Sequence, residues 1–138
     1  MSSAFKHSLK VRFRDVDMLG HVNNAVYFTY LEESRVAFFG SLGYQADHFK
    51  TRCPIILAEA GCQYKSPSYV DEMLDIYLRV SEIRNASFII EYEIKEQKTN
   101  RLVAIAKTAL VTFDYEKQKV IPIPETLRKK LEEAKTAS

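Results

Sequence analysis

The sequence is poor in cysteine, glycine, proline and tryptophan, and it has no long uncharged apolar run. Its 138 residues include two cysteines, four glycines, four prolines and no tryptophan. Cys53 and Cys62 have neither metal-ligand nor redox-motif spacing, so we expect free thiols in a reducing cytoplasm. The longest apolar stretch, residues 102–113, is interrupted by Lys107. It is too short to cross a bilayer, and we expect no membrane contact.

Histidine content and charge argue against two further classes of protein. The three histidines are scattered and form no paired-histidine motif, so we expect neither a metal nor a cofactor. The net charge is only +2, which gives no basic excess of the kind that marks a nucleic-acid partner. Residues 1–10 lack the apolar segment of a secretory signal, which agrees with a cytoplasmic location.

The chain does contain enough apolar material for one packed domain, which we place at residues 1–138. Apolar residues make up 46% of the sequence, and the length suits a single core. Residues 25–39 contain no glycine or proline and predict a helix that is apolar on much of its circumference. One face at helical spacing carries Tyr27, Tyr30, Leu31, Ser34 and Phe38, and other sides carry Phe28, Val36 and Phe39.

Alternating apolar and polar residues predict about five strands. The segments are 9–13, 55–64, 74–80, 88–94 and 102–113. The last is nearly all apolar or small, as in a central strand covered on both faces. Pro124 is well placed to open a closing helix. The order predicts an α+β fold in which a curved antiparallel sheet is wrapped around one long central helix.

The segment at residues 14–27 carries the residues best suited to chemistry. It places two acids, a histidine, a glycine and two asparagines directly before the predicted helix. The start of a helix leaves backbone N–H groups unpaired, and these can receive a carbonyl oxygen as it becomes negative. A nearby carboxylate can attack that carbonyl or deprotonate a water. Helix capping by Asn23 or Asn24 explains the same residues, and from the residues alone it is the stronger interpretation.

The segment resembles the hotdog-fold thioesterases of the 4-hydroxybenzoyl-CoA thioesterase type. The matching residues are Asp15-Val16-Asp17-Met18-Leu19-Gly20, Val22, Tyr27 and Leu31-Glu32-Glu33-Ser34-Arg35, with Tyr64, Pro67 and Pro122-Ile123-Pro124 further along the chain. The resemblance implies that Asp17 is the catalytic carboxylate and that the backbone amide of Asn24 is the oxyanion donor. The run His21-Val22-Asn23-Asn24 resembles the acyl-carrier-protein thioesterase branch. That departure makes His21 and Asn23 secondary site candidates.

The resemblance implies hydrolysis of an acyl thioester of coenzyme A, or of acyl-carrier protein, to free acid and thiol. Asp17 would act as nucleophile or as general base, and the partner would be an acyl-CoA or acyl-pantetheine substrate. A homodimer or homotetramer is implied as well, since an open sheet edge invites pairing. Three alternatives stay open: an enoyl thioester hydratase or dehydratase of the same fold, a non-catalytic acyl-CoA binding protein, and a structural or interaction protein.

Two further expectations concern side chains around the helix. Glu32 and Arg35 are three residues apart, which permits an ion pair along the helix. Tyr27 is expected to pack in the core. Candidates for the lining of an acyl channel are Phe28, Leu31, Ile56, Leu57 and Ala60, although packing in the core is the commoner role of such side chains.

Overall fold

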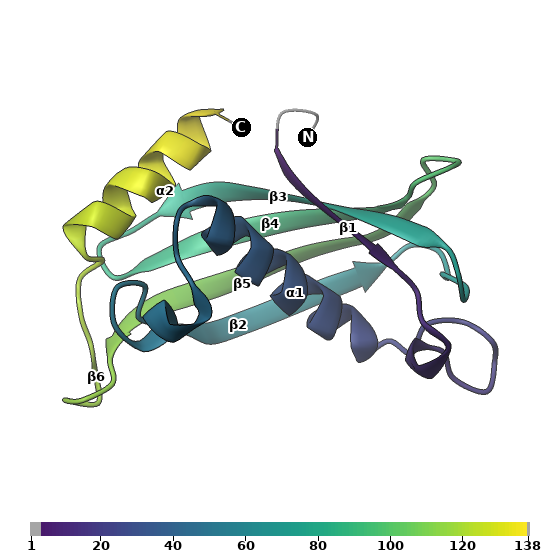
Figure 1. The fold of residues 1–138 in the computed structure, drawn as a ribbon, viewed down its shortest axis with the longest axis horizontal. Helices are drawn as coiled ribbons and strands as arrows, with labels where there is room; N and C mark the ends of the chain where they lie inside the picture. The colour runs from purple at the N-terminus through teal and green to yellow at the C-terminus, as the bar shows by residue number, and fades with distance from the viewer. Residues whose placement is uncertain (1–3, 138) are drawn as a thin grey trace.

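One antiparallel sheet curves around a helix in the computed structural model, which describes residues 4–137 (Figure 1). The strand order is β1-β3-β4-β5-β2, so β1 and β2 are the two edges, and the short β6 pairs with the end of β5. The elements are β1 (Phe5–Lys10), the 3-10 turn η1 (Phe13–Asp15), α1 (Val26–Ser41), the 3-10 turn η2 (Ala46–Lys50), β2 (Ile55–Tyr64), β3 (Met73–Ile83), β4 (Ser87–Glu96), β5 (Leu102–Asp114), β6 (Lys119–Val120) and α2 (Glu125–Ala137).

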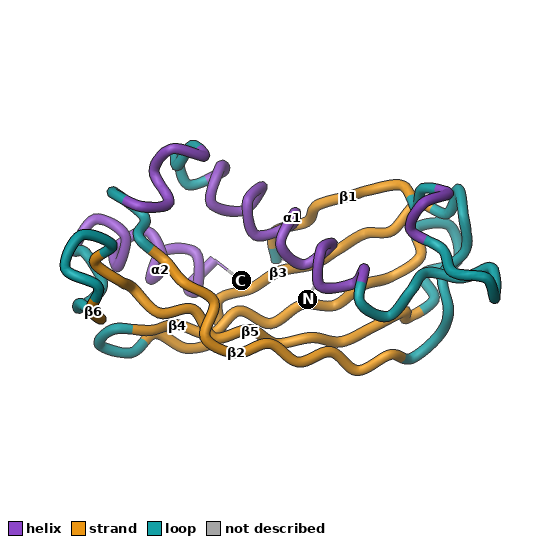
Figure 2. The backbone as a smooth tube through the Cα atoms, turned by 90° about the horizontal axis from the view of Figure 1, so that it is seen from below, coloured by secondary structure: helices purple, strands orange, loops and turns teal. Residues whose placement is uncertain are grey.

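Helix α1 lies across the concave side of the sheet, where it packs most closely on β1 and β3 (Figure 2). The five residues predicted to share its apolar face are all buried. Phe28 and Val36, in contrast, are 38% and 49% exposed. The expectation that the helix is covered on much of its circumference is therefore wrong for the flank that carries these two side chains.

The length of α1 is set by its two ends. Asn23 accepts hydrogen bonds from the backbone N–H groups of Val26 and Ala25, which fixes the start. Gly43, with a φ of +97°, takes the left-handed conformation that ends many helices. The predicted hotdog architecture is confirmed, but the expectation of a long central helix is not. The helix has 16 residues, or about 24 Å at the usual rise.

The strand predictions hold for β2 to β5 and are wrong in two respects. Of the predicted segment 9–13, only Leu9 and Lys10 lie in a strand, because the chain leaves β1 after Lys10 and Asp15 accepts the backbone N–H of Arg12 to close the turn η1. Strand β5 alternates rather than being covered on both faces, since Ile105 and Lys107 are exposed on the outer face. No helix among residues 4–137 is long and apolar enough to cross a membrane.

The edge strand β2 presents one row of side chains to the concave side of the sheet. Directly paired residues of antiparallel strands point to the same face. The β2 row is opposite the buried β5 residues Thr112, Leu110, Thr108, Ala106 and Ala104. A bulge at Ala58 keeps the row in phase along the whole strand. The row consists of Ile55, Leu57, Ala60, Cys62 and Tyr64.

Candidate active site

The residues around Asp17 form a tight hairpin turn. Val16 pairs with Val22, and the Asp17 N–H donates to the His21 carbonyl at 2.9 Å. Gly20 adopts a φ of +85°, which a glycine accepts without strain. The half-buried Asp17 carboxylate accepts the Leu19 N–H through Oδ1 at 2.9 Å. Among residues 4–137 its Oδ2 has no hydrogen-bond partner, so one oxygen is available for chemistry.

Asp15 ties this turn to helix α1. Its buried carboxylate accepts the Tyr30 hydroxyl at 2.7 Å and the Arg12 backbone N–H at 3.0 Å, and its carbonyl accepts the Asn23 N–H. Burial opposes ionisation of Asp15, but the hydrogen bonds from Arg12 and Tyr30 together with the Arg12 charge outweigh it and lower the pKa. Asp15 is therefore a structural anion that holds the loop.

The start of α1 leaves one amide unpaired. The Asn23 side chain accepts the Ala25 N–H at 3.0 Å, and its carbonyl accepts the Val26 N–H at 2.9 Å. The Asn24 carbonyl accepts the Tyr64 hydroxyl at 3.0 Å. The Asn24 N–H has no partner in the described part of the chain. Asn23 thus has the capping role, and Asn24 supplies the free donor.

A hollow of about 320 Å³ opens at this helix start. Tyr27 in its wall is buried, as expected for a core residue, and donates its hydroxyl to Ser68 at 3.1 Å. Burial raises the pKa of Tyr27, which stays a neutral donor. The hollow brings His21 and Asn24 together, whereas Asp17 and Asn23 lie outside its wall. The lining residues are His21, Val22, Asn24, Tyr27, Tyr64, Lys65, Ser66 and Pro67.

Sequence reasoning did not assign Tyr64 or Lys65 to this wall. Both lie about 40 residues after the loop they meet, so no local pattern indicates the contact. The free amide of Asn24 has a local signal, since an asparagine directly before it can cap the helix.

The thiol of Cys62 lies next to Tyr64 on the concave row of β2. Burial raises the pKa of this thiol, which keeps it protonated.

A second hollow of about 260 Å³ lies further along the flank between α1 and β2. Of the expected channel residues, Leu57 lines it and Ala60 lies on the same concave row. Leu31 is instead fully buried in the core, while Phe28 and Ile56 are partly exposed outside both hollows. The lining residues are Glu32, Arg35, Val36, Phe39, Phe49, Ile55, Leu57 and Leu110.

A curved antiparallel sheet around one helix is the architecture of the hotdog proteins. The sequence model of the thioesterase-like superfamily matches residues 11–131, and the chain belongs to this family. The predicted identification as a hotdog-fold thioesterase, that is, as a thioester hydrolase, is thereby confirmed.

Three named proteins illustrate the similarity. The long-chain acyl-CoA thioesterase FadM of Escherichia coli is 27% identical over 128 residues, covering 91% of this chain and 95% of FadM. The 1,4-dihydroxy-2-naphthoyl-CoA hydrolase of Synechococcus elongatus is 26% identical over 121 residues, covering 86% and 88%. The solved structure of BH1999 gentisyl-coenzyme A thioesterase has a TM-score of 0.81 and 26% identity, covering 92% of this chain and 99% of that one.

Proposed function

We propose that the protein hydrolyses acyl thioesters of coenzyme A, with Asp17 as the reacting carboxylate and the Asn24 amide as the oxyanion donor. The observation that carries the proposal is the unpaired N–H of Asn24, a residue that lines the hollow at the start of α1. The names of the relatives support the substrate class, since all three act on coenzyme A thioesters. The family membership supports the reaction type.

The reaction needs the thioester at the rim of the hollow, between Asn24 and the turn that carries Asp17. The backbone N–H of Asp17 donates to His21, and His21 lines the hollow. This pairing supports a position of the Asp17 turn beside the rim. The Asn24 N–H donates to the thioester oxygen as that oxygen becomes negative. In this proposal His21 forms part of the wall beside the water that the reaction consumes. Asn23 positions the Asn24 amide by capping the helix.

Two routes give the same products. In one, the free oxygen of Asp17 attacks the carbonyl carbon and expels the thiolate. Water then cleaves the mixed anhydride to acid and regenerated carboxylate, and the proton released from this water passes to the thiolate. In the other, Asp17 takes a proton from a water that attacks directly, and the proton passes to the departing sulfur. Either way one water is consumed, and one acid and one thiol are formed. Lys65, exposed in the wall, supplies a cation near the carrier arm.

The substitution Asp17→Asn tests the assignment. We expect a loss of about 100-fold or more in kcat, the usual effect of removing an acid–base or nucleophilic group. Thiol release from acyl-CoAs is followed spectrophotometrically, and the melting temperature checks the fold. Asp47→Asn, at a highly exposed carboxylate remote from the hairpin, is the matched control and keeps the wild-type rate. An Asp17→Asn protein with normal turnover overturns the proposal. Enoyl-CoA consumption without thiol release would identify a hydratase instead.

A further inference from the structure

Arg35 is a buried cation that has no anionic partner. Arg35 is only 8% exposed, yet no carboxylate in the described part of the chain lies within 4 Å of its guanidinium. Its one hydrogen bond runs from Nη1 to the Tyr92 hydroxyl at 3.3 Å, which leaves most of its five N–H donors unused. The Tyr92 hydroxyl is itself bonded to Thr108 at 2.6 Å. Burying a charge without a counter-ion is costly, so such a group favours an anionic ligand.

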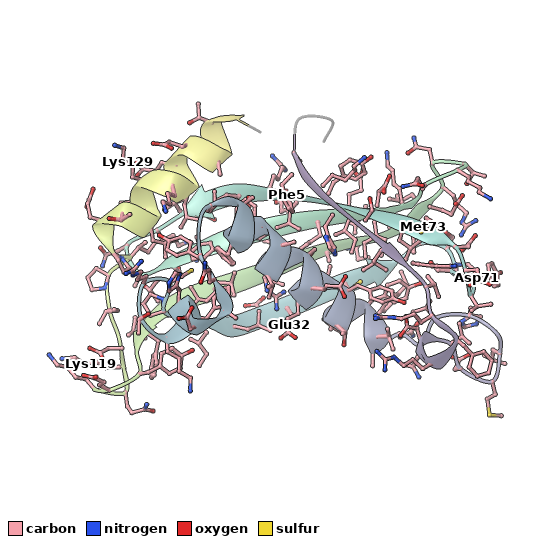
Figure 3. All side chains as sticks on the ribbon, viewed as in Figure 1. Phe5, Glu32, Asp71, Met73, Lys119 and Lys129 are labelled. Atoms are coloured by element: carbon pink, nitrogen blue, oxygen red, sulfur yellow. The ribbon has the colours of Figure 1, made fainter. Side chains whose placement is uncertain are left out.

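The expected ion pair between Glu32 and Arg35 is not formed. Glu32 is exposed on the flank of α1 that faces β2 (Figure 3). Its carboxylate lies at the rim of the second hollow, whereas Arg35 is buried in the wall. The reason is that Arg35 turns toward the sheet to meet Tyr92, away from the solvent that Glu32 requires.

The hollow at Arg35 is otherwise apolar. Apart from Glu32 and Arg35, every residue in its wall is aliphatic or aromatic. Its volume of about 260 Å³ suits the end of an acyl group rather than a cofactor. A single guanidinium in an otherwise apolar chamber favours a ligand that is apolar along its length and negatively charged at one end. The apolar wall consists of Val36, Phe39, Phe49, Ile55, Leu57 and Leu110.

The two hollows lie along the same flank, one at each end of the concave row on β2. Tyr64, at one end of the row, lines the hollow at the helix start, and Leu57 lines the hollow at Arg35. Between them the row carries Ala60 and Cys62, whose side chains are short. Arg35 follows Asn24 by 11 residues, which corresponds to roughly 16 Å along a helix.

We propose that Arg35 binds a carboxylate at the far end of the acyl group, so that the preferred substrates are coenzyme A monothioesters of dicarboxylic acids. This inference rests on the proposed function. An extended chain advances roughly 1.2 Å per bond, so the span of about 16 Å suits an acyl group of roughly ten to twelve carbons. The planar fork of the guanidinium pairs with both oxygens of a carboxylate.

The test compares dodecanedioyl-CoA, dodecanoyl-CoA and 12-hydroxydodecanoyl-CoA by kcat/KM. We expect the wild-type protein to prefer the carboxylate-ended thioester at least tenfold over each of the other two. Equal or better use of the methyl-ended thioester overturns the inference, and a preference for the hydroxyl-ended one overturns the assignment of a carboxylate. These measurements on the unaltered protein need no variant.

Substitutions then test whether Arg35 causes the preference for a terminal carboxylate. Arg35→Met replaces a buried ion with an apolar group of similar length, an exchange that many folds tolerate. We expect it to reduce the carboxylate-to-methyl ratio to about one, and Arg35→Lys, which keeps the charge without the fork, to give an intermediate ratio. Glu32→Gln removes a negative charge at the rim that would repel a substrate carboxylate, so we expect it to raise the carboxylate-to-methyl ratio a few fold. Arg79→Met, on the outer face where Arg79 pairs with Glu91, leaves it unchanged. An unaltered ratio in Arg35→Met assigns the preference elsewhere and overturns the inference.

The outcomes separate this inference from the proposed function. If no acyl-CoA releases thiol in an Asp17-dependent manner, the proposed function fails. If dodecanoyl-CoA is hydrolysed in an Asp17-dependent manner without any preference for a terminal carboxylate, the proposed function stands and only the assignment of Arg35 fails.

Discussion

Tyr64 joins the edge strand to the start of the central helix through one hydrogen bond. Its hydroxyl donates to the Asn24 carbonyl at 3.0 Å, and its ring lies 5.4 Å from the Tyr27 ring. In Tyr64→Phe the ring remains while the bond is lost, so the Asn24 peptide is held less firmly. A bond of this kind contributes about 1 kcal/mol, which is roughly a fivefold change in rate.

We therefore expect Tyr64→Phe to lower kcat about three- to tenfold and to change KM little, because the oxyanion contact strengthens in the transition state. Steady-state thiol release measures both constants. Tyr77→Phe, at a partly exposed tyrosine on β3, serves as control. A fall in melting temperature with unchanged kcat would show that Tyr64 is only structural.

At the scale of single residues, the sequence predicts what depends on near neighbours. The turn at Asp17 and the cap by Asn23 follow from residues within a few positions of each other. The surroundings of Arg35 could not be predicted, because its partner Tyr92 lies 57 positions away on another strand. The i,i+3 rule suggested Glu32 instead, since helical spacing describes only the surface of an isolated helix.

At the scale of elements, periodicity located the central strands but placed the first one too far along the chain, so that it overlaps only the last two residues of β1. Strand β2 spans the predicted residues 55–64, and β3 to β5 contain the predicted segments. Residues 9–13 alternate as a strand does, but Val11 accepts the Asp71 N–H beyond the end of β1, and the chain turns away there. The error arises because a long-range backbone contact and the bonds of Asp15 decide where the strand ends.

The turn between β4 and β5 depends on an ionised carboxylate. Glu96 accepts the backbone N–H groups of Lys98 and Thr99 at 2.9 Å and the Thr99 hydroxyl at 2.7 Å. The hydrogen bond from the Lys98 backbone, followed by those from Thr99, lowers the pKa of Glu96 to about 2. Because the folded pKa lies below the ordinary value of 4.5, the carboxylate stabilises the fold above about pH 4.5 and loses this effect as the pH falls toward 2.

We expect Glu96→Gln to melt at a lower temperature than the wild type at pH 7, because the amide loses the charge that these donors favour. The difference should shrink steadily as the pH falls from 4.5 toward 2, because in that range the Glu96 carboxylate is protonated in the unfolded chain while it is still ionised in the folded protein. A series of thermal melts across that range measures it. Glu116→Gln, in the exposed turn before β6, is the control and should follow the wild-type curve. A difference that is constant with pH would contradict the role given to the charge.

At the scale of the whole molecule, one flank combines a free sheet edge with exposed apolar side chains. Strand β2 is an edge strand of ten residues. It pairs with β5 on one side, and no strand of the described residues pairs with its other side. Beside it α1 exposes Phe28 and Val36, while β2 exposes Ile56 and Leu57, each between 38% and 49%. Long edges with apolar side chains pair with other chains. A second copy that covers this flank would also narrow the open hollows at Asn24 and Arg35.

We therefore expect a native mass of at least two chains, that is, twice 15.9 kDa or more, because pairing along β2 satisfies its free backbone groups and buries the apolar flank. Light scattering after size-exclusion chromatography measures the mass. Phe28→Glu places a charge in that flank outside both hollows and should shift the protein toward one chain, with a parallel loss of turnover. Val120→Glu, at an exposed apolar residue on β6 at another edge of the fold, should keep the wild-type mass and rate. A wild-type protein that is fully active as a single chain at micromolar concentration would contradict this arrangement, since the flank would then be open to solvent during catalysis.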